Sequence, residues 1–161
     1  MADLEVLVRD EGNLVARHRN ILIQVRSGAM TRPILERIES AALLARASAG
    51  GNVAMVAIIE EGATLASDDI RATQAAVVKR MLRDPRTFFV TVVAGQTVAN
   101  QAIQTVMRLL LLGVPRLRSV GTVDEAIAWV MDRVEGTEAA PLREAIVEAR
   151  AMLSERRRPA S

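Results

Sequence analysis

The chain has 161 residues, half of them hydrophobic, and its 21 basic side chains nearly balance 19 acidic ones. This length suits one domain with a real core, and the apolar half excludes a wholly disordered chain. Because acids and bases balance, the composition gives no reason to expect a polyanionic partner for the domain as a whole.

The missing residue types exclude several classes of function. Cysteine is absent, so the chain has no disulfide, no thiolate metal site and no cysteine nucleophile. Tyrosine is absent too, and Phe88, Phe89 and Trp129 are too few aromatic side chains for base stacking. We therefore expect no nucleic-acid partner, and no motif indicates a metal or a cofactor.

Two further absences bear on where the protein works. Residues 1–5 lack the charged start and long apolar core of a signal peptide. The Leu-rich run at residues 109–114 is far shorter than the ~20 residues that span a bilayer. The sequence therefore predicts a cytoplasmic protein without integral membrane insertion.

The amino-terminal region has the pattern of short antiparallel strands. Segments 4–9, 14–17 and 21–26 are β-rich and are separated by Gly, Asn and Asp. His18, the only histidine, falls in the second break, where we expect a solvated turn residue. Nothing local would orient it as a catalytic base.

Strands and helices alternate after this hairpin. Segments 53–59 and 87–93 are apolar at both alternating sets of positions, which is typical of strands covered on both faces. Helices are expected after Thr31, after Ser67 and after Gly95, and Thr122 opens a capping box. A short strand is expected at residues 117–120, and the final helix at 141–154.

This order predicts an α/β fold with a mixed sheet that opens with an antiparallel hairpin. Its later strands are expected to be parallel, with helices packed over the sheet and an extra C-terminal helix. We expect the main domain to span residues 1–135. Residues 136–161 would then form the C-terminal helix and a basic tail.

Two stretches carry a family resemblance. Residues 88–95 and 118–130, the second including Glu125-Ala126-Ile127-Ala128-Trp129-Val130, resemble the STAS domains of anti-sigma-factor antagonists and their SpoIIAA-like relatives. The likeness covers roughly residues 13–134. It implies a STAS-like sheet and a non-catalytic regulatory or scaffolding module that binds other proteins in the bacterial cytosol.

The resemblance also suggests a phosphorylation site and a docking surface. Many STAS domains carry a phosphorylatable Ser or Thr at the start of the helix after the central strand. Ser67 holds that position here, with Thr64 as a second candidate. The usual Asp-Ser-Ser-Gly-like context is absent, and the neighbouring acids would repel a phosphate, so a simple N-cap is the alternative role for Ser67. The expected partner contacts are Leu65, Asp68, Asp69, Gln96, Thr97 and Asn100.

Self-association is a competing expectation. Residues 109–112 are apolar all round the helix end, and the final helix has its own apolar stripe. Each would cover the other, or one would meet a second copy of the chain. The expected oligomer contacts are Leu109, Leu111, Leu112, Leu142, Ile146 and Leu153.

Two other functions are compatible with the sequence. STAS-like and SEC14-like relatives share a topology, and a core of small side chains leaves room for a small ligand or a lipid. A homo-oligomeric structural protein is the other alternative. An enzyme is the least favoured, because general acid–base work would fall to Asp and Glu and no pair stands out.

Overall fold

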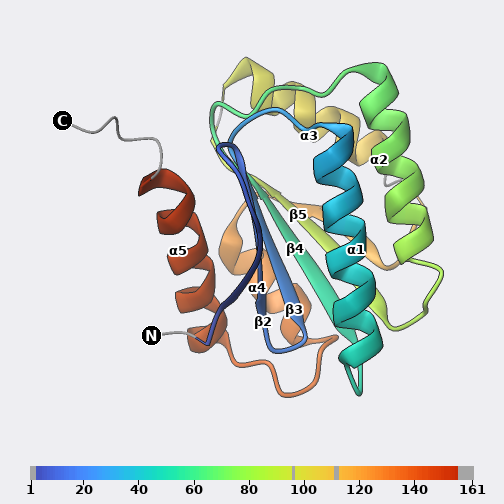
Figure 1. The fold of residues 1–161 in the computed structure, drawn as a ribbon, viewed down its shortest axis with the longest axis vertical. Coiled ribbons are helices and arrows are strands. Elements are labelled where there is room, and N and C mark those ends of the chain that lie inside the picture. Colours follow the sequence, from blue (N-terminus) through green and yellow to red (C-terminus); the bar gives the residue numbers. More distant parts are fainter. Residues whose placement is uncertain (1–2, 96, 111–112, 156–161) are drawn as a thin grey trace.

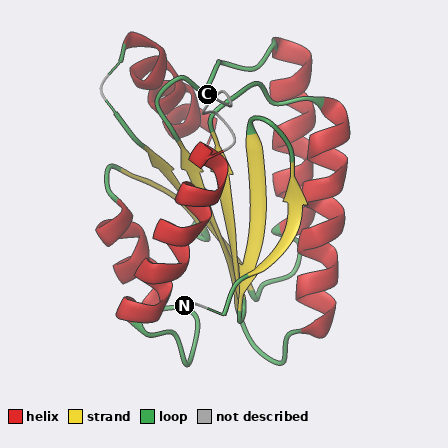
Figure 2. Cartoon of the chain, turned by 60° about the vertical axis from the view of Figure 1, so that its left-hand side comes forward, coloured by secondary structure: helices red, strands yellow, loops and turns green. Residues whose placement is uncertain are grey.

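The computed structural model describes residues 3–95, 97–110 and 113–155. Within these ranges the chain forms three layers, with a six-stranded sheet between two layers of helices (Figures 1 and 2). The predicted α/β class with an antiparallel start is confirmed.

The strands follow one another across the sheet in chain order, β1-β2-β3-β4-β5-β6. The first three pair antiparallel, and β3 to β6 pair parallel. Their bounds are β1 Glu5–Arg9, β2 Asn13–His18, β3 Ile21–Arg26, β4 Val53–Ile59, β5 Thr87–Val93 and β6 Leu117–Val120.

The helices divide between the two faces of the sheet for a topological reason. Parallel neighbours are joined by right-handed crossovers, so strands that advance in one direction place their crossover helices on one face. These helices are α1 Arg32–Ser48, α2 Asp68–Met81 and α3 Val98–Leu110. The opposite face is covered by the two helices after the last strand, α4 Val123–Met131 and α5 Ala139–Glu155 (Figure 1).

Strand β4 contributes side chains to the cores on both faces of the sheet. All seven of its residues are buried. Val56 and Ile58 lie in the core under α4 and α5, whereas Met55 and Ala57 lie in the core under α1 and α2. Alternating side chains point to opposite faces of a strand, so a strand covered twice must be apolar throughout.

The final helix packs on the sheet. The apolar side of α5, including Leu142, Ile146 and Leu153, lies in the same core as β2 and β3. Figure 2 shows α5 lying across the sheet, opposite the pair formed by α1 and α2. The predicted division at residue 135 therefore separates α5 in sequence, whereas its buried side belongs to the core of the preceding residues.

Two predicted helix starts are confirmed by their hydrogen bonds. The Ser67 hydroxyl accepts a hydrogen bond from the Ile70 backbone N–H at 3.4 Å, and the Thr122 hydroxyl accepts one from the Glu125 N–H at 3.2 Å. Each bond satisfies a backbone donor that has no partner within the helix. Thr31 holds the N-cap position of α1, but its side chain makes no capping hydrogen bond.

The expectation for His18 is wrong. The turn between β2 and β3 consists of only two residues, and Arg19 adopts φ +53° there. His18 therefore remains in the strand, paired with Ile21, and is buried. Its Nδ1 lies 2.9 Å from the Asp3 carbonyl oxygen.

Candidate functional site

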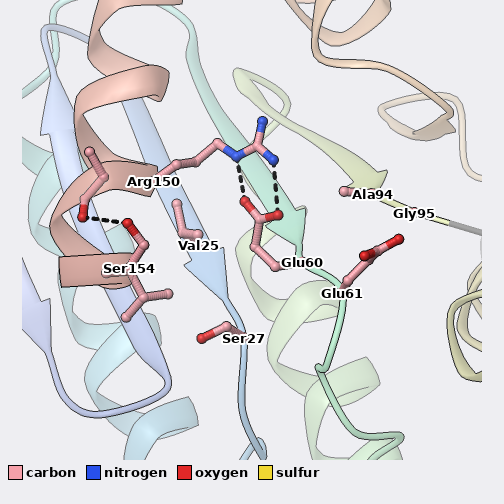
Figure 3. A pocket seen from close by; sticks show the side chains of 10 residues that line it. Val25, Ser27, Glu60, Glu61, Ala94, Gly95, Arg150 and Ser154 are labelled. Atoms are coloured by element: carbon pink, nitrogen blue, oxygen red, sulfur yellow. Dashed lines mark hydrogen bonds and ion pairs between the residues drawn. The ribbon is translucent and has the colours of Figure 1, made fainter. Parts of the chain in front are cut away.

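The loops that follow β3, β4 and β5 meet at one edge of the sheet, because parallel strands end at the same edge. Ligands of open α/β sheets commonly bind at this carboxyl edge. Here a cavity of about 530 Å³ lies between these loops and α5. We call it the edge cavity. Its polar lining comes from Ser27, Glu60, Glu61, Arg150 and Ser154 (Figure 3).

An ion pair crosses the edge cavity. Both guanidinium nitrogens Nε and Nη2 of Arg150 donate to the Glu60 carboxylate, and the Nη2–Oε2 distance is 2.9 Å. Figure 3 shows the two side chains facing each other, one from the end of β4 and one from α5. This forked pairing is the strong geometry for arginine and a carboxylate. It joins the last helix to the central strand, so an anionic ligand of Arg150 would have to displace Glu60.

A second carboxylate lies against a glycine. Gly95 follows β5 with φ +84°, a conformation that favours glycine. Any side chain at position 95 would also collide with the side chain of Glu61. The Glu61 side chain is exposed and would have to move to accommodate any other residue at position 95.

The predicted docking residues have different environments. Leu65 and Thr97 are exposed. Asp68 and Asp69 are exposed in the first turn of α2, where they pair with Arg71 and Arg32 respectively. They form a polar rim at the start of α2. Gln96 lies outside the described residues.

Asn100 does not belong to the surface, so its predicted contact role is wrong. Its side chain is fully buried, and its Nδ2 donates to the Ala94 carbonyl. Its backbone N–H donates to the Thr97 hydroxyl at 3.2 Å. Asn100 therefore anchors α3 to the end of β5, which the helical period alone does not indicate.

The two predicted phosphorylation sites, Ser67 and Thr64, are both exposed. Ser67 is the N-cap of α2, as described above. The Thr64 carbonyl accepts a hydrogen bond from Arg26 Nη2 at 3.1 Å, so the backbone of this loop is attached to β3. Modification of either hydroxyl stays a prediction.

The predicted oligomer contacts divide between surface and core. Leu109 is 66% exposed on α3. Leu142, Ile146 and Leu153 are buried against the sheet within the same chain, so their predicted role as contacts between copies is wrong. The apolar stripe of α5, for which the sequence alone indicates no partner surface, is covered by the sheet of the same chain. Leu111 and Leu112 lie outside the described residues.

Sequence reasoning missed the ion pair. The periodicity of the last helix predicts its apolar side and assigns no role to Arg150. A local sequence window cannot connect residues 90 positions apart. Two features of the sequence indicate this edge, namely two acids directly after the strand at 53–59 and a glycine two residues after the strand at 87–93.

No protein-family model matches the chain, and no curated protein matches it. The resemblance to STAS domains therefore stays a prediction. Among residues 3–95, 97–110 and 113–155, no helix is long and apolar enough to cross a membrane. The same residues contain no cluster of three or more His, Asp or Glu side chains placed to hold a metal ion.

Proposed function

We propose that this chain is a non-catalytic, STAS-like protein-interaction module of the bacterial cytosol. In this proposal a partner protein binds α3 and the loop of residues 60–67. One observation carries the proposal, which is an exposed apolar stripe along α3. Val98 is 84% exposed and Leu109 is 66% exposed on a helix whose other side contacts β5 and β6.

The spacing of the exposed residues places them along one side of the helix. Val98, Ala102 and Leu109 are exposed and fall on one side of α3, with Thr105 between the last two. Large exposed apolar patches on soluble proteins commonly mark interaction sites, so this side of α3 is the surface we assign to a partner. We call these four residues the α3 stripe.

The loop of residues 60–67 extends this surface. Its Ala63 packs against Ile103 on the inner side of α3, and its Leu65 is 43% exposed. Polar side chains follow at the start of α2, where Asp68 and Asp69 form the rim. An apolar centre with a polar rim is the usual organisation of a protein interface.

The position of the histidine supports a binding role over catalysis. His18 lies next to Ile21, at the start of β3, and so at the opposite edge from the edge cavity. In the edge cavity, Arg150 and Glu60 neutralise each other. A general base needs an available lone pair within reach of the substrate, so Glu60 would first have to lose its partner, and Glu61 is the other carboxylate of this cavity.

Photo-crosslinking in cells tests the docking proposal. A photoreactive phenylalanine analogue replaces Val98 in one variant and Val147 in the other, because both side chains are exposed and lie on different helices. We expect a discrete crosslinked product from position 98 and none from position 147. A product of twice the chain mass would identify the partner as a second copy and support the homo-oligomer alternative.

The same experiment can contradict the proposal. Identical product patterns from positions 98 and 147 would show random collisions and no defined surface. Leu109→Glu, introduced together with the analogue at position 98, is the second control. Because Leu109 is exposed, the variant should fold, and it should reduce a specific product at least tenfold.

Binding of a small ligand or lipid is the second candidate function, and the edge cavity supports it. Its volume of about 530 Å³ falls within the range of small-molecule sites. Native mass spectrometry of the purified chain should then reveal a bound molecule that is lost in Arg150→Met. Arg143→Met, at an exposed position of the same helix, is the control. A ligand-free mass for all three proteins would reject this candidate.

A further inference from the structure

A second, much smaller cavity lies on the other face of the sheet, under α2. Its volume is about 20 Å³. Polar side chains from three elements line it, with Gln24 and Arg26 on β3, Thr91 on β5 and Gln74 on α2. We call it the arginine cavity.

The strand register explains why there is space at this point. Gln24, Ala57 and Thr91 are direct neighbours across β3, β4 and β5. Adjacent strands are about 4.8 Å apart, so Gln24 and Thr91 lie on either side of Ala57. The methyl group of Ala57 fills little of the gap between them. In the preceding row of the same face, Leu22, Met55 and Phe89 are large and apolar.

Arg26 brings a charge to this cavity without a counter-charge. Its side chain is 4% exposed, and Nη2 donates to the Thr64 carbonyl at 3.1 Å. Its buried Nε has no hydrogen-bond partner within the described ranges. No carboxylate in those ranges forms an ion pair with Arg26 either, although eight other arginines do.

Thr91 adds a second polar group without a partner. It is 0% exposed, and its hydroxyl has no hydrogen bond to any residue that the structure describes. Buried polar groups are nearly always hydrogen-bonded, and an unpaired buried charge costs several kcal/mol. Two such groups on one cavity indicate that a bound species completes it.

We propose that the arginine cavity binds one chloride ion. The guanidinium of Arg26 provides the charge, and the Thr91 hydroxyl and the Gln24 amide provide further donors. A volume of about 20 Å³ is close to the ~10–15 Å³ that one water molecule needs, so the cavity has room for one water molecule or one small ion. Water would satisfy the hydrogen bonds but would leave the charge of Arg26 uncompensated.

The site has a structural consequence for the loop above it. Arg26 holds the Thr64 carbonyl, and Thr64 precedes the exposed Leu65. An ion that fixes the Arg26 side chain therefore also stabilises the loop of residues 60–67. Chloride binding in the arginine cavity does not require a docking partner on α3.

Thermal unfolding of the full chain tests the proposal. Sodium chloride is compared with sodium gluconate at equal ionic strength, because gluconate is too large for the cavity. A ligand that binds only the folded state raises Tm with its concentration. We expect Tm to rise by about 3–6 °C in chloride relative to gluconate.

Three variants identify the site. Thr91→Val keeps the side-chain shape and removes the hydroxyl, and Arg26→Gln removes the charge. Both should lose most of the difference between chloride and gluconate. Arg143→Met should keep the full difference, because Arg143 is an exposed arginine paired with Asp124. Equal Tm values in the two salts for the unmodified chain, or a chloride effect unchanged in Thr91→Val, would overturn the proposal.

Anomalous scattering provides a test that does not depend on the variants folding. A crystal of the unmodified chain grown in sodium bromide should show a bromide peak within about 3.5 Å of the Arg26 guanidinium and the Thr91 hydroxyl. A water molecule there without anomalous signal, at a bromide concentration that populates other sites, would reject chloride binding.

Discussion

Helices α3 and α5 both carry apolar residues at helical spacing, but only α5 buries all of its stripe. α5 lies along β2 and β3 on the face that no crossover helix covers, so Leu142 and Ile146 become core residues. α3 packs on β5 and β6 at the far end of the sheet and leaves Val98 and Leu109 exposed. An apolar period therefore identifies a helix that needs a partner surface, whereas the tertiary structure decides whether the same chain provides that surface.

The largest expected effect on stability concerns the buried side of α5. Ile146→Ala should lower the free energy of unfolding by about 2–5 kcal/mol, because it removes a fully buried side chain and leaves a cavity. Urea denaturation monitored by circular dichroism measures this loss. Val147→Ala, at the next and exposed position, is the matched control and should change stability by less than about 0.5 kcal/mol. Equal losses in the two variants would contradict the packing of α5 described above.

An intermediate effect concerns the attachment of α3. Asn100→Ala removes the donor to the Ala94 carbonyl and should cost about 1–3 kcal/mol, because a partly buried acceptor loses its partner. Gln101→Ala, at an exposed neighbouring position of the same helix, should leave stability nearly unchanged. Hydrogen exchange should locate the weakening in α3 and the end of β5. Exchange that accelerates evenly over the whole sheet would contradict a local anchor.

The smallest effect on stability is expected in the α3 stripe. Leu109→Ala should change the free energy of unfolding by less than about 0.5 kcal/mol, since the side chain is largely exposed. The proposed docking function would nevertheless lose affinity for its partner. A loss of stability similar to that of Ile146→Ala would show that Leu109 is covered within the chain, and the two helices would then no longer differ.

Much of the fold could be predicted from sequence because interactions between residues close in the chain determine its strands and helix starts. Segments 53–59 and 87–93 are apolar on both alternations, and both became central strands with these bounds. Ser67 and Thr122 begin helices because their hydroxyls satisfy backbone donors within three residues. Such contacts lie within one short window of sequence, which is why pattern reasoning finds them.

The candidate sites could not be predicted in the same way. Glu60 meets Arg150 only because β4 ends at the edge that α5 crosses. Gln24 and Arg26 alternate with apolar residues in β3, a pattern that also suits a strand with one solvated face. Helices α1 and α2 cover that face, so Arg26 is buried without a carboxylate. A polar residue in a strand therefore indicates a buried site only when the structure shows that helices cover that face of the sheet.

The sequence by itself determined the α/β class, the order of the elements and most of their boundaries, because backbone propensities, caps and periodicity act over a few residues. The tertiary structure decided which apolar surfaces remain exposed and which charges remain unpaired. Both depend on contacts between segments far apart in the chain. The buried α5 stripe, the exposed α3 stripe and the unpaired Arg26 all follow from that packing.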